Sequence, residues 1–391
     1  MRIVAITSLR LTGLAELPGD HGRGVDALDI YPEFGQQAWQ PTAVGIGPRR
    51  LQVLYLRIST DQGVDGVHGP ISPEQYAAIR QIYRGFLIGR DPRPANLLWD
   101  QLMRLDRHGR TGLGMMAISA IDNALWDIRG KLHGVPVHRL LGGPTRERIP
   151  AYATSYPDLD PAVVAERARA LVAAGYVHQK WFFRFGPGDG WHGMERNLAM
   201  AAALRQAVGD EVDLMFDCRR AWDLPYAVEM LRGLEPLRPR WVEEPLMAGQ
   251  LDAHRRLRQA VRVPIATGEH LYTRWEAKPY CDEHLIDYLQ VDPEWCGGIT
   301  EWMKIAYMAE ATGVAVLPHG RLIAPAAQVA AAVSPTVCPL LECIVGAHLP
   351  AMQHFNLAPL LPVDGQVTLP DTPGMGIAID MTRVEHREEL D

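Results

Sequence analysis

Within residues 213–320 the sequence repeats one arrangement five times, in the runs DLMFD (213–217), WVEEP (241–245), PIATGE (264–269), DYLQVD (287–292) and VAVLPHG (314–320). Each run is short, mostly apolar and strand-like, and a helix-like stretch follows it. The ionisable residues at or near the ends of these runs are spaced 26, 26, 23 and 27 positions apart; they are Asp217, Glu243, Glu269, Asp292 and His319. One strand, one helix and two loops take roughly 25–30 residues. The spacing therefore predicts five consecutive βα units.

These five ionisable residues are expected to converge. In a (β/α)8 barrel the carboxyl ends of the strands share one mouth, and side chains placed there face the same space. Three carboxylates followed by an aspartate and a histidine suit a divalent metal ion and a base. The repeat therefore predicts a fold and the place of a site within it.

The flanking sequence supplies the other three strands. AYATS (151–155) and HQKWFF (178–183) are predicted as the first and second strands, and CPLLEC (338–343) as the eighth. A helix is predicted over 161–174, with Gly175 just past its end, where glycine commonly closes a helix. We therefore predict an α/β fold built on a modified, TIM-like (β/α)8 barrel.

The residues before and after the barrel carry no such alternation. RIVAITSLRL (2–11) and LQVLYLRIST (51–60) are predicted strands of a meander, and helical patterns follow them. The expected division is an α+β capping domain over 1–125, the barrel over 126–350, and a C-terminal segment over 351–391 that returns to the capping domain.

Composition narrows the class of protein. The chain has 391 residues, of which 47% are hydrophobic, and a net charge of −7. Its basic residues are scattered, which argues against a nucleic-acid surface, and no apolar run approaches the roughly 18 residues that span a bilayer. The five cysteines lack CxxC spacing, which favours a reduced, cytoplasmic protein over a disulfide framework or a zinc site.

Asp217, Glu243 and Glu269 are the predicted metal ligands. Mg²⁺ prefers hard oxygen ligands in an octahedron, and three carboxylates from adjacent strands supply half of such a shell. The set contains no histidine or cysteine that would favour zinc. The alternative is that one or two of these carboxylates are structural and cap the following helix. Glu244 is expected to point the other way along the strand, into packing or a salt bridge.

Asp292 and His319 are the predicted base. A carboxylate at one ring nitrogen fixes the tautomer and raises the basicity, which leaves the other nitrogen for proton transfer. Lys180, on the second strand, is expected to neutralise a substrate carboxylate or to act as an acid; alternatively, it points into the helix layer. Glu342, at the eighth strand, is a candidate hydrogen-bond donor to an enolate oxygen if it is protonated. His270, beside a predicted ligand, is expected to support that ligand or to face the substrate.

This set of residues suits the abstraction of a proton α to a carboxylate. The dianion that results is unstable without electrophilic help, and a metal ion stabilises the charge as it develops.

At these residues the sequence resembles the enolase superfamily, and within it the mandelate racemase subgroup. The stretch AIDNALWDIRGKLHGVPVHRLLGG (120–143) is similar to that family's entry to the barrel, and FDC, VEEP, ATGEH, QVDP and LPHG carry the rest of the likeness. Enzymes of this superfamily pair a lysine or histidine base with Mg²⁺. The resemblance implies that the three carboxylates bind Mg²⁺, that Asp292 and His319 form the base, and that Glu342 lies near the substrate carboxylate.

Within the subgroup the nearest likeness is to L-rhamnonate dehydratases and related acid-sugar dehydratases, through KWFFRFGP (180–187), GEHLYTR (268–274) and EWCGGITE (294–301). Such enzymes take an aldonate or aldarate, remove the C2 proton and eject the C3 hydroxyl, which gives a 2-keto-3-deoxy acid. The resemblance implies that the histidine acts first as the base and then, protonated, as the acid toward the departing hydroxide.

Two departures from the subgroup bear on the reaction. Racemases of the subgroup carry a K-x-K pair on strand two, whereas this chain has Lys180-Trp181-Phe182. The missing second lysine argues against 1,1-proton transfer, because inversion needs bases on both faces. The position two after Asp217 is often asparagine in the subgroup and is Arg219 here. That cation is a candidate for binding a distal hydroxyl or a second carboxylate.

The segment from Pro18 to Arg49 is a second source of candidates. It is rich in glycine, proline and aromatic residues, and a loop of this length in a compact domain is usually functional or disordered. The candidates for substrate binding in this segment are His21, Arg23, Tyr31 and Trp39.

Three hypotheses follow. The leading one is a Mg²⁺-dependent acid-sugar dehydratase with a small-molecule acid sugar as its partner and no role for nucleic acid or membrane. The second is a racemase or epimerase in which Lys180 is the opposing base. The third is a non-catalytic binding protein on the same barrel. The resemblance also implies a homo-oligomer.

Overall fold

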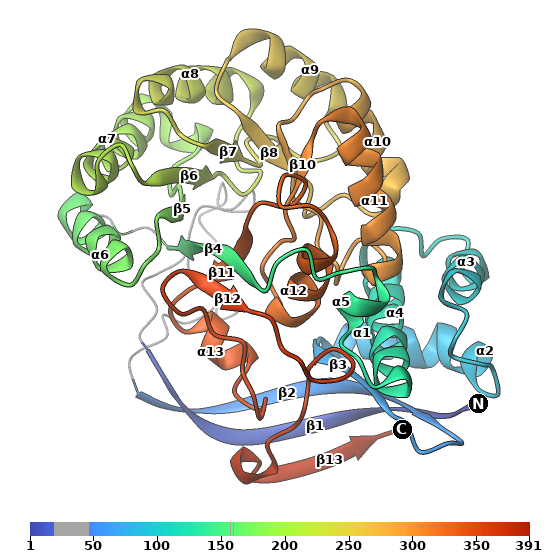
Figure 1. Cartoon of the computed structure of the whole chain (residues 1–391). Coiled ribbons are helices and arrows are strands. Elements are labelled where there is room, and N and C mark those ends of the chain that lie inside the picture. The colour runs from blue at the N-terminus through green and yellow to red at the C-terminus, as the bar shows by residue number, and fades with distance from the viewer. Residues whose placement is uncertain (19–46, 157, 159) are drawn as a thin grey trace.

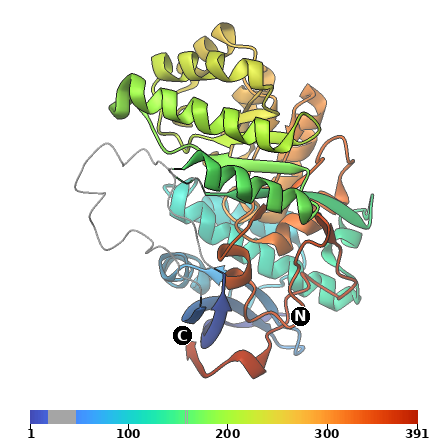
Figure 2. The ribbon, with the colours of Figure 1, turned by 90° about the vertical axis from the view of Figure 1, so that its left-hand side faces the viewer.

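The computed structural model describes residues 1–18, 47–156, 158 and 160–391 (Figure 1). The four candidates of the long N-terminal segment, His21, Arg23, Tyr31 and Trp39, lie outside the described residues. The rest of the chain forms a capping sheet with its helices and a barrel above it, and Figure 2 shows both termini on the side of the capping sheet.

The capping sheet has the strand order β13-β1-β2-β3 and is antiparallel. Its strands are β1 (Ile3–Leu17), β2 (Gly47–Thr60), β3 (Gly66–Ile71) and β13 (His386–Leu390). The last strand pairs with the first, from Ser8 opposite Leu390 to Thr12 opposite His386. The predicted return of the C-terminal segment to the capping domain is therefore confirmed.

Helices cover one side of this sheet. They are α1 (Pro73–Ala78), the π-helical turn η3 (Ile79–Tyr83), α2 (Arg84–Leu87), α3 (Ala95–Leu105) and α4 (Gly112–His133). Ser72 begins the first of them with a capping box, in which its hydroxyl and the side chain of Gln75 each accept the other's backbone N–H. Helix α4 runs without a break from the capping side to the barrel, so position 125 lies inside it. The domain limits expected from the sequence stay predictions.

The barrel contains the eight predicted parallel strands. They are β4 (Arg148–Ser155), β5 (His178–Phe182), β6 (Asp213–Asp217), β7 (Trp241–Glu243), β8 (Ile265–Thr267), β9 (Tyr288–Leu289), β10 (Ala315–Val316) and β11 (Leu341–Ile344). Their order is β10-β9-β8-β7-β6-β5-β4-β11, and the short strand β12 (Gln366–Thr368) pairs antiparallel with β4. The predicted fold class is confirmed.

Helices alternate with these strands around the outside (Figure 1). They are α5 (Val137–Leu140), α6 (Pro161–Ala173), α7 (Gly190–Val208), α8 (Leu224–Leu234), α9 (Leu251–Ala260), α10 (Thr273–Asp282), α11 (Gly298–Thr312), α12 (Ile323–Ala332) and α13 (His348–Met352), with the 3₁₀ turns η4 (Pro187–Asp189), η5 (Glu235–Leu237) and η6 (Met381–Arg383). Gly175 has φ +86 just past α6, as its predicted C-cap role requires.

The strand register fixes where the functional side chains lie. Asp217 pairs with Glu243 across β6 and β7, so the two carboxylates end neighbouring strands at one level. Met215 precedes Asp217 by two positions and therefore points to the same face. It belongs to a buried apolar cluster with Tyr152, Trp241, Ala266, Leu317 and Leu340. An apolar floor of this kind excludes water and strengthens the interactions among charges above it.

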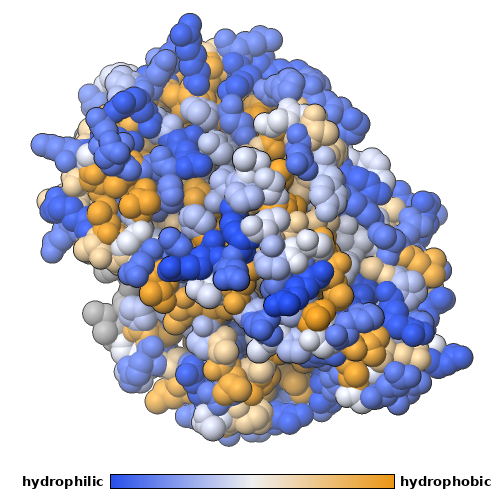
Figure 3. Space-filling view, in the orientation of Figure 1, coloured by the Kyte–Doolittle hydropathy of each residue, from blue (hydrophilic) through white to orange (hydrophobic). Residues whose placement is uncertain are grey.

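In the view of Figure 3, apolar side chains are scattered among polar ones and do not form a single large patch. Among the described residues, no helix combines the length and apolar character needed to cross a membrane. The cysteine side chains Cys218, Cys281, Cys296, Cys338 and Cys343 are free thiols and are all buried. They pack as small apolar residues.

Candidate active site

Lys180 lies at the centre of the barrel mouth. Its Nζ is 2.6 Å from Glu243 Oε1, 2.8 Å from Glu342 Oε1 and 3.1 Å from Asp217 Oδ2, and its side chain is 1% exposed. Burial alone would lower the pKa of this amine, but the three carboxylates hold that pKa well above its ordinary value. The alternative that Lys180 points into the helix layer is wrong.

Asp217 and Glu243 are held by further donors. Asp217 Oδ1 accepts the backbone N–H of Arg219 at 2.9 Å, and Glu243 Oε2 accepts from Gln290 Nε2 at 2.6 Å and from Trp241 Nε1 at 3.2 Å. Burial and the charge of Asp217 raise the pKa of Glu243 well above its ordinary value. This excess of buried negative charge, in hard oxygen donors, fits a divalent cation such as Mg²⁺.

Glu269 faces two histidines in this structure. Its Oε1 is 3.2 Å from His270 Nδ1, and its Oε2 is 3.1 Å from His319 Nε2. Glu244, Glu269 and His270 place one ligand atom each within 4.8 Å of one another, which is a spacing that can hold a metal ion. The predicted ligands thus lie at one mouth in two groups. Asp217 and Glu243 contact Lys180, whereas Glu269 contacts the two histidines. Their assignment as one triad stays a prediction.

Glu244 follows the last residue of β7 and contacts other partners than Glu243 does. It is buried, with Oε1 3.0 Å from His270 Nδ1 and Oε2 3.3 Å from Arg220 Nε. The expected salt bridge is confirmed. The backbone turns sharply here, because Arg219, Arg220 and Glu244 all have left-handed φ values, between +41 and +62. Such strained residues cluster at functional sites.

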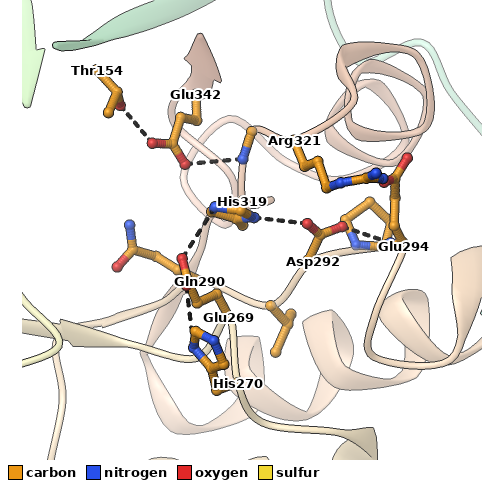
Figure 4. A network of polar contacts seen from close by, with 12 residues as sticks. Thr154, Glu269, His270, Gln290, Asp292, Glu294, His319, Arg321 and Glu342 are labelled. Carbon is orange, nitrogen blue, oxygen red and sulfur yellow. Dashed lines mark hydrogen bonds and ion pairs between the residues drawn. The ribbon is translucent and has the colours of Figure 1, made fainter. Parts of the chain in front are cut away.

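Asp292 and His319 form a hydrogen-bonded pair at the mouth (Figure 4). Asp292 Oδ2 is 2.7 Å from His319 Nδ1, and Asp292 Oδ1 accepts the backbone N–H of Glu294 at 2.6 Å. The ring of Trp295 lies 4.9 Å from that of His319. Burial would lower the pKa of His319, but Glu269 and Asp292 raise it well above its ordinary value. Because Asp292 occupies Nδ1, Nε2, which lies 3.1 Å from Glu269 Oε2 in this structure, is the nitrogen that can exchange a proton with a substrate.

Glu342 joins the two end strands of the sheet at the mouth. Its Oε1 accepts from Thr154 Oγ1 at 2.5 Å and its Oε2 from Gly320 N at 2.9 Å. A side chain at Gly320 would not fit, since a Cβ there would lie 2.5 Å from Glu342 Cγ. Burial raises the pKa of Glu342, but Lys180 and His319 outweigh it and lower the pKa to about 2. In this structure both carboxylate oxygens of Glu342 accept hydrogen bonds. Its role as a donor to an enolate oxygen, expected if the group is protonated, stays a prediction.

The side of the mouth that carries the second lysine in racemases is different here. Phe182 follows Lys180 by two positions and shares its face of β5. The guanidinium of Arg219 lies 5.3 Å from the centre of the Phe182 ring. A guanidinium stays protonated at all physiological pH values and does not act as a base. The residues described at this position therefore offer a cation and an apolar ring.

Comparison with known families identifies this architecture. Residues 163–383 match the family described as "Enolase C-terminal domain-like", and residues 34–142 match the "Mandelate racemase / muconate lactonizing enzyme, N-terminal domain". The chain belongs to the enolase superfamily. Its place is in the mandelate racemase subgroup, as the sequence predicted.

Two curated relatives from this superfamily are similar over most of their length. The chain is 36% identical over 347 residues to a D-galactonate dehydratase of Ralstonia nicotianae, which covers 85% of this chain and 90% of the relative. It is also 36% identical over 350 residues to a D-galactarolactone cycloisomerase of Agrobacterium fabrum, with the same shares covered.

Solved structures agree with this placement. L-rhamnonate dehydratase from Gibberella zeae superposes with a TM-score of 0.83 at 28% identity, covering 98% of this chain and 94% of that one. A racemase from Streptomyces coelicolor A3(2) with bound magnesium superposes with a TM-score of 0.79 at 25% identity, covering 98% of both chains.

Three site residues of this enolase-superfamily chain escaped the sequence analysis. Gln290 donates to Glu243, Thr154 donates to Glu342, and Trp295 packs on His319. Gln290 had a detectable signal, because it precedes Asp292 by two positions and so shares its face of the strand. Thr154 is the penultimate residue of the predicted strand 151–155, close to the strand end where a functional side chain is expected. Trp295 lies in a loop, where no periodicity points to it.

Proposed function

We propose that the protein is a Mg²⁺-dependent acid-sugar dehydratase that acts on an aldonate or aldarate of the L-rhamnonate or D-galactonate type. It removes the C2 proton and eliminates the C3 hydroxyl, which gives a 2-keto-3-deoxy acid. The observation that carries the proposal is a single Asp292–His319 pair beside a buried carboxylate cluster, with Phe182 where a second base would be. The dehydratases among its relatives support the same class of substrate.

His319 performs both proton transfers in this proposal. Nε2 takes the C2 proton while Asp292 keeps Nδ1 and stabilises the imidazolium. The electron pair of the broken C2–H bond moves into the substrate as an enediolate. It then forms the C2–C3 double bond as the C3–O bond breaks. The imidazolium returns its proton to the departing hydroxide as water, and the enol product tautomerises to the ketone.

The carboxylate cluster supplies the metal ligands in this proposal. Asp217, Glu243 and Glu269 would hold Mg²⁺, which as a Lewis acid supplies stabilisation of negative charge on the substrate carboxylate. Lys180 contributes a fixed positive charge among the three carboxylates that it contacts. Arg219 and His270 remain the proposed contacts to the substrate on either side of the cluster.

The test is a screen of acid sugars for 2-keto product by semicarbazide absorbance. The library holds aldonates and aldarates, with L-rhamnonate and D-galactonate among them. D-Galactarolactone and 3,6-anhydro-D-galactonate are added because similar proteins are cycloisomerases named for these compounds. We expect turnover of at least one linear acid sugar, and loss of that turnover in His319→Asn with Mg²⁺ affinity retained. An absence of turnover across the library, with Mg²⁺ shown to be bound, contradicts the proposal.

The racemase hypothesis makes a different prediction for the same library. In D₂O a racemase exchanges the substrate α-proton without loss of water, whereas a dehydratase releases water in step with keto product. Exchange alone, abolished by Lys180→Arg, would favour the racemase. The expected cytoplasmic location and homo-oligomeric assembly stay predictions, and the assembly is measured by light scattering on the purified protein.

A further inference from the structure

Glu294 and Arg321 form an ion pair that lies beside the Asp292–His319 pair. Each of its members follows a member of the catalytic pair by two residues, so both pairs span 27 positions of sequence. Arg321 Nη1 is 2.6 Å from Glu294 Oε2, and Figure 4 shows the two pairs side by side. The loops that follow β9 and β10 are therefore joined by two charged pairs.

This ion pair is largely buried. The side chain of Glu294 is 2% exposed and that of Arg321 is 24% exposed. Burial raises the pKa of Glu294, and the Arg321 cation opposes that rise because it favours the charged form. A carboxylate in such a place is costly unless a cation pairs with it. Since Glu294 also donates its backbone N–H to Asp292 Oδ1 at 2.6 Å, a shift of Glu294 moves the partner of the base.

The capping sheet contacts the same ion pair. Arg321 Nη1 donates to the carbonyl of Pro70 at 3.2 Å, and His68 Nε2 is 3.8 Å from Glu294 Oε1. Both Pro70 and His68 belong to β3. The ring of His68 is fully buried, and burial together with Arg321 lowers its pKa to about 3, so the ring is neutral. Strand β3 thus covers the ion pair with neutral polar groups.

The loop after Asp292 has other anchors, which come from helix α4. Asn123 Nδ2 donates to the carbonyl of Pro293 at 3.0 Å, and Ser119 Oγ accepts the N–H of Gly297 at 2.9 Å. These contacts fix the backbone of one loop. They do not reach the loop that carries His319, whereas the Glu294–Arg321 pair, like the Asp292–His319 pair, joins the two loops.

We infer that Glu294 and Arg321 are positioning residues that keep Asp292 and His319 at their observed relative positions. Through Arg321 and His68 they also couple these positions to the placement of strand β3 against the barrel. The inference rests on the proposed function, in which His319 is the base. A general base must stay within hydrogen-bond reach of its proton, and a misplacement of about 1 Å costs on the order of 10²-fold in rate.

Arg321→Met, Arg321→Lys and Glu294→Gln test this role. We expect Arg321→Met to lower kcat by about 10²-fold with little change in KM or in Mg²⁺ affinity. Arg321→Lys should recover most of that loss, because a lysine still pairs with Glu294. The double variant Glu294→Gln/Arg321→Met should cost less than the two single losses combined, because the residues act as one unit.

Arg240→Met is the matched control. Arg240 pairs with Asp213, also 27 positions away, and its side chain is likewise 24% exposed, but the pair lies at the opposite end of the barrel. We expect its kcat to stay within about 3-fold of the wild type, since it joins no loop of the mouth. Equal kcat in Arg240→Met and Arg321→Met, with both less stable than the wild type, would overturn the inference.

Hydrogen exchange gives a readout that needs no substrate. Arg321→Met should speed exchange in residues 66–71 and 318–322, and Arg240→Met should not. If the wild type turns over no acid sugar and this pattern is found, the coupling stands and the proposed function fails. Turnover that depends on His319, with unchanged exchange and kcat in Arg321→Met, overturns the coupling and leaves the proposed function intact.

Discussion

Two histidine–aspartate pairs occupy opposite ends of the barrel. At the mouth, His319 Nδ1 is 2.7 Å from Asp292 Oδ2, and at the starts of β5 and β6 His178 Nδ1 is 2.7 Å from Asp213 Oδ2. The first pair is nearly enclosed, with Asp292 fully buried, whereas the side chains of the second are 21% and 37% exposed. The geometry of the pair alone therefore does not mark a catalytic base.

The two ends of the barrel differ in how their charges are balanced. Asp213 is also hydrogen-bonded to Arg240, so its charge has a dedicated cation at the solvent edge. At the mouth, Asp217, Glu243 and Glu342 share the single ammonium of Lys180, and Glu269 rests on histidines. A charge-balanced, partly exposed ion pair contributes little to the free energy of unfolding. A buried, anion-rich cluster strongly favours the binding of a cation, and in the proposed function Mg²⁺ would be that cation.

Removal of the metal should have the largest effect, and β6 supplies a paired test because it has an aspartate at each end. We expect EDTA to abolish turnover and Mg²⁺ to restore it. Asp217→Asn should weaken Mg²⁺ binding by more than the roughly 10–100-fold seen when outer ligand partners are changed. Asp213→Asn should leave it unchanged. Titration calorimetry measures both, and equal Mg²⁺ affinity in the two variants would show that Asp217 is not a ligand.

The second largest difference is expected between variants of His319 and His178. His319→Asn removes the base, and general acid–base catalysis is worth about 10²–10⁴-fold, so kcat should fall by that factor. His178→Asn changes the pair at the other end and should alter kcat by no more than a few-fold. Steady-state kinetics on the substrate found in the screen compares them. If both variants lose activity equally, the distinction drawn between the two ends is wrong.

Lys180→Met tests the charge balance through stability. Removing one partner of a buried ion pair costs about 3–5 kcal/mol, because the carboxylates around Lys180 would lose their cation. We expect added Mg²⁺ to recover part of this loss, since it supplies positive charge to the same carboxylates. Arg240→Met, its control at the partly exposed Arg240–Asp213 pair, should cost less, about 1 kcal/mol, with no Mg²⁺ effect. Urea unfolding with and without Mg²⁺ measures these values.

The smallest effect concerns pH and Asp213. Burial raises the pKa of this carboxyl group, but hydrogen bonds from His178 and Arg240 lower it below its ordinary value. A lowered pKa in the folded protein gives stability that is present above pH about 4 and is lost as the pH falls through the folded value. The stability gap between the wild type and Asp213→Asn should therefore close in acid. A gap that widens below pH 4 would contradict this assignment.

The sequence predicted the barrel well because the signal is local. Each βα unit reads as an apolar run followed by a helical stretch, and the ionisable residue at its end needs no knowledge of other strands. The extent of the strands was less accurate. VAVLPHG predicts a strand of several residues, whereas only Ala315 and Val316 pair in β10. Leu317, the next residue, still donates its backbone N–H to the carbonyl of Leu289 at 2.8 Å, and the run then leads into the loop that carries His319.

The sequence does not predict which side chains from distant strands contact one another. Lys180 was open to three interpretations, because strand alternation does not say which carboxylates meet an inward lysine. Glu342 is a candidate donor only if it is protonated, and the sequence does not show that Lys180 lies 2.8 Å from its Oε1 and lowers its pKa. No local pattern assigns a role to Gln290 or Arg321, because each makes its contact with a residue on another strand or loop.

The sequence by itself determined which side chains stand at the mouth, because spacing along the chain fixes the end of each strand. It also determined that Phe182 stands where a second lysine would be. Only the tertiary structure decided how those side chains are charged and held. The charge of a group depends on the ions packed around it and on its distance from water, and neighbouring strands and the capping sheet set both. That is why Asp292–His319 and Asp213–His178, equal in distance, differ in their predicted roles.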